Sequence, residues 1–197
     1  MSGRLLLVRH GQTEWSRTGR HTGRTDVPLT DEGEGQARAL RGWVQGLHPR
    51  LVLTSPLQRA WRTADLAGLT DVVVDPDLQE WDYGGYEGLT TPQIRESTYP
   101  GWTVFRDGVV PGETPGETLD EVAARGRKVI DRLRPELDHG DVVLVGHGHA
   151  LRVLATCWLD ADPCLGSQLL LDPATTSELG SQHDVPAIVH WNVPATA

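Results

Sequence analysis

Short apolar runs and segments of helical periodicity alternate along the chain. The runs at residues 5–8, 51–54, 72–74 and 142–145 have the length of strands. Helices are expected after Thr30, after Ser55-Pro56 and after Thr118, and residues 150–159 read as a buried helix. This alternation predicts an α/β fold, a three-layer sandwich in which a mostly parallel sheet is covered by helices on both faces.

The remaining segments give weaker patterns. Residues 14–28 and 78–88 predict loops, and a short helix is expected to start at Thr90-Thr91-Pro92. Near the C-terminus, only residues 169–171 and 187–191 have the character of edge strands. Because no linker or low-complexity run interrupts the 197 residues, we expect a single domain over residues 1–197.

Polar side chains follow three of the predicted strands directly. Arg9-His10 ends the first strand, Ser55 to Arg59 follows the second, and Gly146-His147 ends the strand at 142–145. Ligands of such sheets bind beyond the carboxyl ends of the strands, so these groups can converge although they are far apart in sequence. The spacing therefore predicts a site at this edge of the sheet.

The net charge of the chain limits the kinds of molecule that it is expected to bind. The formal net charge of −9 argues against nucleic acid or an acidic membrane surface, because such partners require a surplus of Lys and Arg. Of the 18 basic residues only Lys128 is a lysine, so nearly every cation is a planar guanidinium suited to phosphate or carboxylate. A small anionic molecule is the expected partner.

Cysteine use and hydropathy indicate the compartment. Cys157 and Cys164 form no disulfide framework and no zinc-type motif, which favours reduced thiols in a cytoplasm. No apolar segment approaches the roughly 20 residues needed to span a bilayer, and the N-terminus lacks the apolar core of a signal peptide. We therefore expect a soluble, cytoplasmic protein.

Histidines and arginines at strand ends suit a phosphoryl group. Guanidinium groups and helix N-terminal N–H groups bind its oxygens, and a neutral imidazole can attack phosphorus or hydrogen-bond an oxygen. A metal site is the alternative, in which His147, His149 and His10 would bind zinc or iron as in a metallohydrolase. No carboxylate motif accompanies them, so the expectation is that neither metal nor cofactor takes part.

Three motifs in this order carry a resemblance to a known family. Arg9-His10-Gly11 with Thr13, the segment Thr54 to Ala60 with Thr63-Ala64, and Gly146-His147-Gly148 each follow an apolar strand. Together they resemble the histidine phosphatase superfamily, the phosphoglycerate mutase-like group. The resemblance covers most of the chain and implies the phosphoglycerate mutase-like fold and metal-independent phosphoryl transfer.

The resemblance also implies roles for individual residues. His10 would form a phosphohistidine, Arg9 and Arg59 would bind phosphoryl oxygens, and His147 would stabilise the charge of the transition state. Glu80 matches the family's proton donor, with Asp82 and Glu87 as alternatives. The positions that match substrate-binding residues are Gln12, Thr22, Gly23, Tyr83 and Gly148.

Departures from the mutase pattern favour hydrolysis. Mutases of this group use basic residues downstream of the proton donor to hold a second phosphoryl group, whereas the stretch from Glu80 to Arg125 holds only Arg95 and Arg106 between those two residues. The run from Glu80 to Thr90 is more similar to the small acid phosphatases and sugar bisphosphatases. We expect a phosphomonoesterase for small metabolites such as sugar phosphates.

Three points stay open at the level of sequence. A phosphoglycerate mutase is the first alternative function, and a phospho-ligand binding module without catalysis is the second. The segments that would choose the ester, residues 14–28 and 88–115, have no readable geometry. The oligomeric state is not fixed, and a homodimer is one of the states left open.

Overall fold

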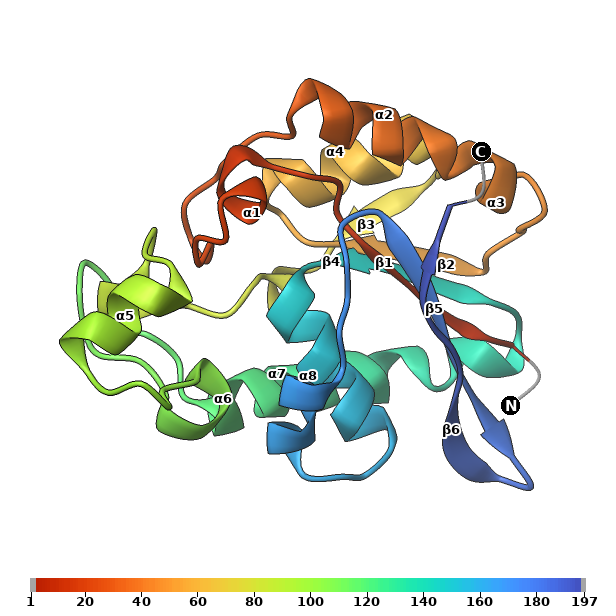
Figure 1. The fold of residues 1–197 in the computed structure, drawn as a ribbon. Coiled ribbons are helices and arrows are strands. Elements are labelled where there is room, and N and C mark those ends of the chain that lie inside the picture. Colours follow the sequence, from red (N-terminus) through yellow and green to blue (C-terminus); the bar gives the residue numbers. More distant parts are fainter. Residues whose placement is uncertain (1–2, 196–197) are drawn as a thin grey trace.

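The computed structural model describes residues 3–195 and is built around a six-stranded sheet with the order β3-β2-β4-β1-β5-β6 (Figure 1). The strands are β1 (Leu5–Arg9), β2 (Leu51–Thr54), β3 (Val72–Val74), β4 (Val142–Gly146), β5 (Thr175–Gln182) and β6 (Val185–Pro194). Neighbours among β1 to β4 are parallel, and β5 and β6 join as antiparallel strands. The predicted mostly parallel sheet is confirmed.

Helices cover both faces of this sheet. The α-helices are α1 (Glu14–Arg17), α2 (Asp31–Ala39), α3 (Arg41–Val44), α4 (Gln58–Ala67), α5 (Thr91–Ser97), α6 (Val104–Asp107), α7 (Leu119–Leu133) and α8 (Gly148–Trp158). Short 3-10 helices are η1 (Pro76–Leu78), η2 (Gly84–Tyr86), η3 (Glu136–Asp138) and η4 (Pro163–Gln168). In Figure 1, α2, α3 and α4 lie over one face, and α7 and α8 lie over the other.

The alternation of side chains in β1 explains the two layers. Leu5 and Leu7 belong to the apolar core shared with α7 and α8, whereas Leu6 and Val8 belong to the core shared with α2 and α4. Successive side chains of a strand point to opposite faces, so a run that is buried on both sides must be apolar throughout. The run Leu5–Val8 is therefore the centre of the three-layer fold.

Helix caps occur at the predicted threonines. The Thr118 hydroxyl accepts the N–H of Glu121 at 3.2 Å and the Glu121 carboxylate accepts the N–H of Thr118 at 2.8 Å, which completes a capping box before α7. Thr90 caps α5 through Gln93 in the same way. Within residues 3–195 no helix combines the length and the apolar character needed to cross a membrane.

The C-terminal strands differ from the prediction. Residues 169–171 are not a strand, and the strand beside β1 is instead β5, whose sequence is mostly polar. Its buried positions include Thr175, Thr176 and Ser177, so apolar alternation does not mark it. Residues 187–191 do lie in an edge strand, but β6 runs from Val185 to Pro194.

Candidate active site

The strand register brings the three predicted motifs together. Arg9 lies opposite Gly146 in the pairing of β1 with β4, and Thr54 lies opposite Val145 in the pairing of β2 with β4. The N–H of His10 donates to the carbonyl of Gly146 at 3.0 Å. Since β4 lies between β1 and β2, the residues after all three strands share one edge of the sheet.

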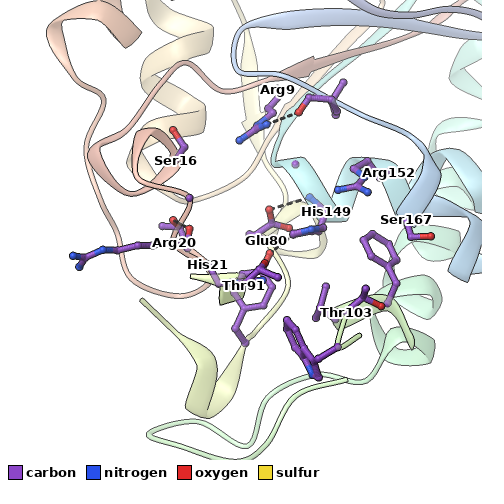
Figure 2. Close-up of a pocket in the computed structure, with 18 of the residues that line it drawn as sticks. Arg9, Ser16, Arg20, His21, Glu80, Thr91, Thr103, His149, Arg152 and Ser167 are labelled. Carbon is purple, nitrogen blue, oxygen red and sulfur yellow. Dashed lines mark hydrogen bonds between the residues drawn. The ribbon is translucent and has the colours of Figure 1, made fainter. Parts of the chain in front are cut away.

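A cavity of about 360 Å³ opens at this edge (Figure 2). Its walls come from the end of β1, the segment that follows β1, and the loop before α5. Helix α6 and the start of α8 complete them. Six of the residues predicted for the site line it, namely Arg9, His10, Thr22, Glu80, Tyr83 and Gly148. Arg59 and His147 are fully buried and are not part of the lining.

His10 presents one ring nitrogen that has no partner within residues 3–195. Its Nδ1 lies 2.7 Å from the carbonyl oxygen of Gly11, and a carbonyl only accepts, so Nδ1 carries the proton. Nε2 is then the unprotonated nitrogen. Burial, followed by the charges of Arg59 and Arg9, holds the pKa of His10 well below the ordinary value of a histidine. The imidazole is neutral, as an attacking nitrogen requires.

His147 is buried between two partners. Arg59 Nε donates to His147 Nδ1 at 3.2 Å, which leaves the ring proton on Nε2, 2.7 Å from the hydroxyl of Ser55. Burial and the positive charge of Arg59 hold the pKa of His147 well below its ordinary value. The rings of His147 and His10 are in edge contact, with centroids 5.1 Å apart.

These low pKa values give a testable pH dependence. Nuclear magnetic resonance of the ligand-free protein is expected to show the His10 and His147 ring carbons in the neutral form at every pH above about 6.5, with titration only at lower pH. Variants at each position assign the two signals, and the urea-unfolded chain is the control that titrates near 6.5. A His10 signal that titrates at or above 6.5 would contradict the assignment.

The lowered pKa of His10 and of His147 also determines how the free energy of unfolding changes with pH. Below pH 6.5 the unfolded chain binds protons that the buried histidines of the folded chain do not take up, so the free energy of unfolding falls as pH falls. Each such histidine contributes up to about 1.4 kcal/mol per pH unit in that range. Urea unfolding of the ligand-free protein at pH 7 and pH 5.5 measures this loss.

Arg59 organises the loop that follows α1. It extends from α4, and its terminal nitrogens donate to the carbonyls of Thr22, Gly23 and Thr25 at 2.9 to 3.0 Å. With Nε on His147, every nitrogen of this guanidinium contacts a protein acceptor. Arg59 therefore acts on the surroundings of the cavity through its charge, and its predicted contact with phosphoryl oxygens stays a prediction.

Arg9 has a donor without an acceptor. Its Nη1 donates to the carbonyl of Leu171, while its buried Nε has no hydrogen-bond partner among the described residues. The guanidinium lies against Gly148, where a Cβ atom would be 3.4 Å from its Cζ. Buried donors of this kind are nearly always satisfied, so this Nε is a donor for which the described residues supply no acceptor.

Glu80 is anchored to the start of α8. Its carboxylate accepts the backbone N–H of Trp81 at 2.9 Å, of His149 at 3.1 Å and of Ala150 at 2.8 Å. Figure 2 shows Glu80 beside His149 inside the cavity. The side chain is therefore fixed in the wall of the cavity that His10 also lines, a position from which a proton donor can act.

The two alternative donors have other partners. The Glu87 carboxylate accepts the N–H groups of Gly23 and Thr25, at 2.9 to 3.1 Å. Asp82 accepts the N–H of Gly84 at 3.0 Å and lies 3.5 Å from Arg24 Nε. Neither carboxylate lines the cavity. These contacts hold the surrounding loops in place.

Gln12 and Gly23 lie outside the cavity lining. The Gln12 side chain accepts the hydroxyl of Thr30 at 3.0 Å, at the start of α2. A Cβ on Gly23 would lie 2.5 Å from the carbonyl oxygen of Trp81, so only glycine fits at this close approach. Among the described residues both positions shape the loops around the cavity, and a direct contact with substrate stays a prediction.

The structure adds residues that the motifs did not place in the site. His21 and His149 line the cavity with their rings stacked at 6.0 Å, and His149 Nδ1 lies 2.5 Å from the hydroxyl of Tyr83. Arg152 lines the same wall, one turn further along α8. His149 and Arg152 are three residues apart in α8 and so lie on one face of it, whereas the helix predicted over residues 150–159 left His149 out.

The side-chain contacts bear on the alternative of a metal site formed by His10, His147 and His149. Both ring nitrogens of His147 have protein partners, and His149 Nδ1 is paired with Tyr83. Within residues 3–195 no three His, Cys, Asp or Glu side chains are grouped so that they could hold a metal ion. The predicted trio of His10, His147 and His149 does not converge on one point.

Comparison with known proteins agrees with this geometry. Residues 5–194 match the histidine phosphatase superfamily, branch 1. The chain is 43% identical over 185 residues to an acid phosphatase of Mycobacterium tuberculosis, covering 92% of this chain and 88% of that protein. It is 40% identical over 184 residues to a sedoheptulose 1,7-bisphosphatase of Saccharomyces cerevisiae, covering 80% and 68% respectively.

A solved structure extends the likeness to the whole fold. The product of an open reading frame of Mycobacterium tuberculosis matches with a TM-score of 0.92 at 38% sequence identity, covering 100% of both chains. The predicted phosphoglycerate mutase-like fold and the resemblance drawn from the three motifs are confirmed. The chain belongs to the histidine phosphatase superfamily, branch 1, and is a hydrolase of phosphate esters.

Proposed function

We propose that this phosphatase cleaves phosphomonoesters through a phosphohistidine on His10. The observation that carries the assignment is a neutral, buried imidazole whose Nε2 has no partner among the described residues, next to Arg9, whose Nε likewise has none. Nε2 attacks phosphorus, the bond to the ester oxygen breaks, and the phosphoryl group is bound to His10. Arg9 supplies positive charge to the phosphoryl oxygens.

Glu80 handles the protons in this proposal. In the first step Glu80 acts in its carboxylic acid form and gives its proton to the departing alkoxide, which leaves as an alcohol. In the second step the Glu80 carboxylate takes a proton from water, the water oxygen bonds to phosphorus, and the P–N bond breaks. Inorganic phosphate is released, and His10 and Glu80 regain their starting states.

His147, Ser55 and Arg59 support the transition state. In the ligand-free protein Nδ1 of His147 accepts from Arg59 Nε, so a donor role of His147 requires that substrate binding separates these two atoms. Ser55, whose hydroxyl can donate as well as accept, then donates to Nε2 and leaves the proton on Nδ1. That proton then stabilises negative charge on the phosphoryl group. Loss of one such donor costs on the order of 10² to 10³ in rate. Arg59 adds its charge from behind His147.

Small phosphorylated metabolites such as sugar phosphates are the proposed substrates. A cavity of about 360 Å³ accommodates molecules of that size, and the related proteins include a sugar bisphosphatase. Thr22, Tyr83 and Gly148 line the space and are proposed to contact the substrate, while Gln12 and Gly23 are proposed to contribute through the loop around it.

A product assay tests the function. We expect inorganic phosphate from sugar phosphates, phosphoglycerates and bisphosphates, with little conversion of 3-phosphoglycerate to its isomer. Isomerisation without phosphate release would favour the mutase alternative. Binding of these esters with neither turnover nor a phosphorylated enzyme would favour a binding module. Activity lost with a chelator and regained with metal would revive the metal alternative.

We also propose a cellular location, a partner class and a domain organisation for the enzyme. The free thiols of Cys157 and Cys164 support a cytoplasmic location, and the net charge of −9 supports a partner other than nucleic acid. We further propose a single domain over residues 1–197, because one sheet runs through the described part of the chain. Sedimentation analysis decides between a monomer and the homodimer left open by the sequence.

A further inference from the structure

The turn that carries His10 after β1 is held by two helices of one layer. Helices α2 and α4 cover the same face of the sheet (Figure 1), and a side chain from each contacts the backbone beside Gly11. A Cβ atom on Gly11 would lie 2.4 Å from the carbonyl oxygen of Gly33 in α2, and a Cβ atom on Gly33 would lie 2.0 Å from that of Gln12. The backbone of this turn is therefore in direct contact with the first turn of α2.

Thr63 of α4 holds the peptide group between His10 and Gly11. Its side chain is fully buried, and its hydroxyl donates to the carbonyl of Arg59, four residues earlier, at 2.7 Å. With its proton used in this way, the hydroxyl accepts the N–H of Gly11 at 3.0 Å. The carbonyl of the same peptide group accepts the N–H of Ala174 at 3.1 Å, so this peptide plane is fixed at both ends.

Gln36 of α2 holds the next peptide group, between Gly11 and Gln12. Its side-chain oxygen accepts the N–H of Gln12 at 2.9 Å. The carbonyl of this peptide group belongs to Gly11 and lies 2.7 Å from Nδ1 of His10. The amide of Gln36 thus sets the direction of the oxygen that accepts the proton of the imidazole.

Gly11 cannot supply this order by itself. A glycine has the widest choice of φ and ψ, and the close approach of α2 leaves no room for a side chain here. The two peptide planes therefore keep their orientation through hydrogen bonds from outside the turn. Neither Thr63 nor Gln36 is among the described residues that line the cavity, so both act on the site only through the backbone of Gly11.

We propose that Thr63 and Gln36 are positioning residues that act through Gly11 on His10. They orient the imidazole and keep its proton on Nδ1, so that Nε2 is presented to phosphorus. Reacting groups have to be held within about 0.5 Å of the productive geometry, and a displacement of about 1 Å lowers the rate on the order of 10²-fold. This inference rests on the proposed function, because both residues act through the proposed nucleophile.

Removal of each acceptor tests the proposal. Thr63→Val keeps the shape of the side chain without the hydroxyl, and Gln36→Met keeps the length without the oxygen. In single-turnover reactions with nitrophenyl phosphate, either variant should phosphorylate His10 about 10- to 100-fold more slowly, with the same affinity for the ester. Thr63→Ser and Gln36→Glu keep an oxygen that accepts and should recover most of the rate.

Thr156→Val is the matched control for Thr63→Val. Thr156 is a second buried threonine whose hydroxyl donates to a carbonyl of its own helix, that of Val153 at 2.6 Å, and it lies in α8 outside the cavity lining. We expect both substitutions to lower the midpoint of thermal unfolding, whereas only Thr63→Val should slow phosphorylation. A role of Thr63 in stability alone would leave the rate unchanged in both variants.

The nitrogen spectrum of the His10 ring supplies a readout that does not depend on turnover. At a pH where the ring is neutral, wild type and Thr156→Val should show one tautomer, with the proton on Nδ1. In Thr63→Val and Gln36→Met the signals of the two ring nitrogens should move toward the average of both tautomers. Comparison with His10→Ala identifies these signals.

The outcomes separate the positioning role from the chemistry. Wild-type rates of phosphorylation in Thr63→Val and Gln36→Met, with an unchanged tautomer, would overturn the proposal while hydrolysis stands. Absence of a phosphorylated enzyme in wild type with every ester would overturn the proposed function, and the nitrogen spectra would still test how His10 is held. If Thr63→Val did not fold, Gln36→Met, at a half-buried position, would decide between the same outcomes.

Discussion

His10→Ala is expected to abolish turnover while the protein stays folded. The substitution removes the nitrogen that would bond to phosphorus, and loss of a nucleophile lowers kcat by on the order of 10⁴ to 10⁶. The fold should persist because β1 is paired along its length with β4 on one side and β5 on the other. Phosphate release from a sugar phosphate and thermal unfolding measure the two effects.

A trapping experiment gives this prediction a second readout. Wild-type protein mixed with substrate and quenched in alkali should carry an acid-labile phosphoryl group, and His10→Ala should carry none. His139→Ala, at an exposed histidine outside the cavity, is the control with wild-type turnover and trapping. Turnover near the wild-type rate in His10→Ala would refute the assignment of the nucleophile.

Glu80→Gln is expected to have an effect that depends on the leaving group. An alkyl phosphate needs a proton on its departing oxygen, and general acid catalysis contributes about 10² to 10⁴ in rate. A nitrophenyl phosphate leaves as a stabilised anion and should lose much less in its first step. The measurement is phosphorylation of the enzyme by the two esters in single-turnover experiments, before water enters the reaction.

Variants of Glu87 and Asp82, the two alternative proton donors, are compared with Glu80→Gln. Glu87→Gln weakens the hold on Gly23 and Thr25, whose carbonyls accept from Arg59, and so should slow both esters by similar factors. Asp82→Asn acts on the loop around Gly84 in the same manner. If Glu87→Gln or Asp82→Asn showed the dependence on the leaving group and Glu80→Gln did not, the proton donor would have to be reassigned.

The strand ends explain why the centre of the site was predictable. Apolar runs that stop at Arg9-His10, Thr54-Ser55 and Gly146-His147 belong to β1, β2 and β4, which are neighbours in the sheet. In a parallel sheet such ends meet at one edge, whatever their distance in sequence. The fold class and the convergence of these motifs followed from that rule.

Other parts of the fold and site depend on contacts that a linear pattern does not contain. Strand β5 is buried partly through Thr and Ser hydroxyls, so its composition resembles a loop. The predicted helix after Thr30 divides at Leu40 into α2 and α3. Arg152 depends on Phe105 from a distant segment for its position. Such pairs become visible only when the layers are assembled.

The hydrogen bond from His10 Nδ1 to Gly11 has a chemical consequence for the modified protein. With one ring nitrogen held by the backbone, only Nε2 is open to phosphorus. Of the two regioisomers that a phosphorylated imidazole can form, this chain is therefore expected to produce the Nε2-linked one alone. A reagent selective for that isomer would recognise the loaded enzyme, and one selective for the Nδ1-linked isomer would not.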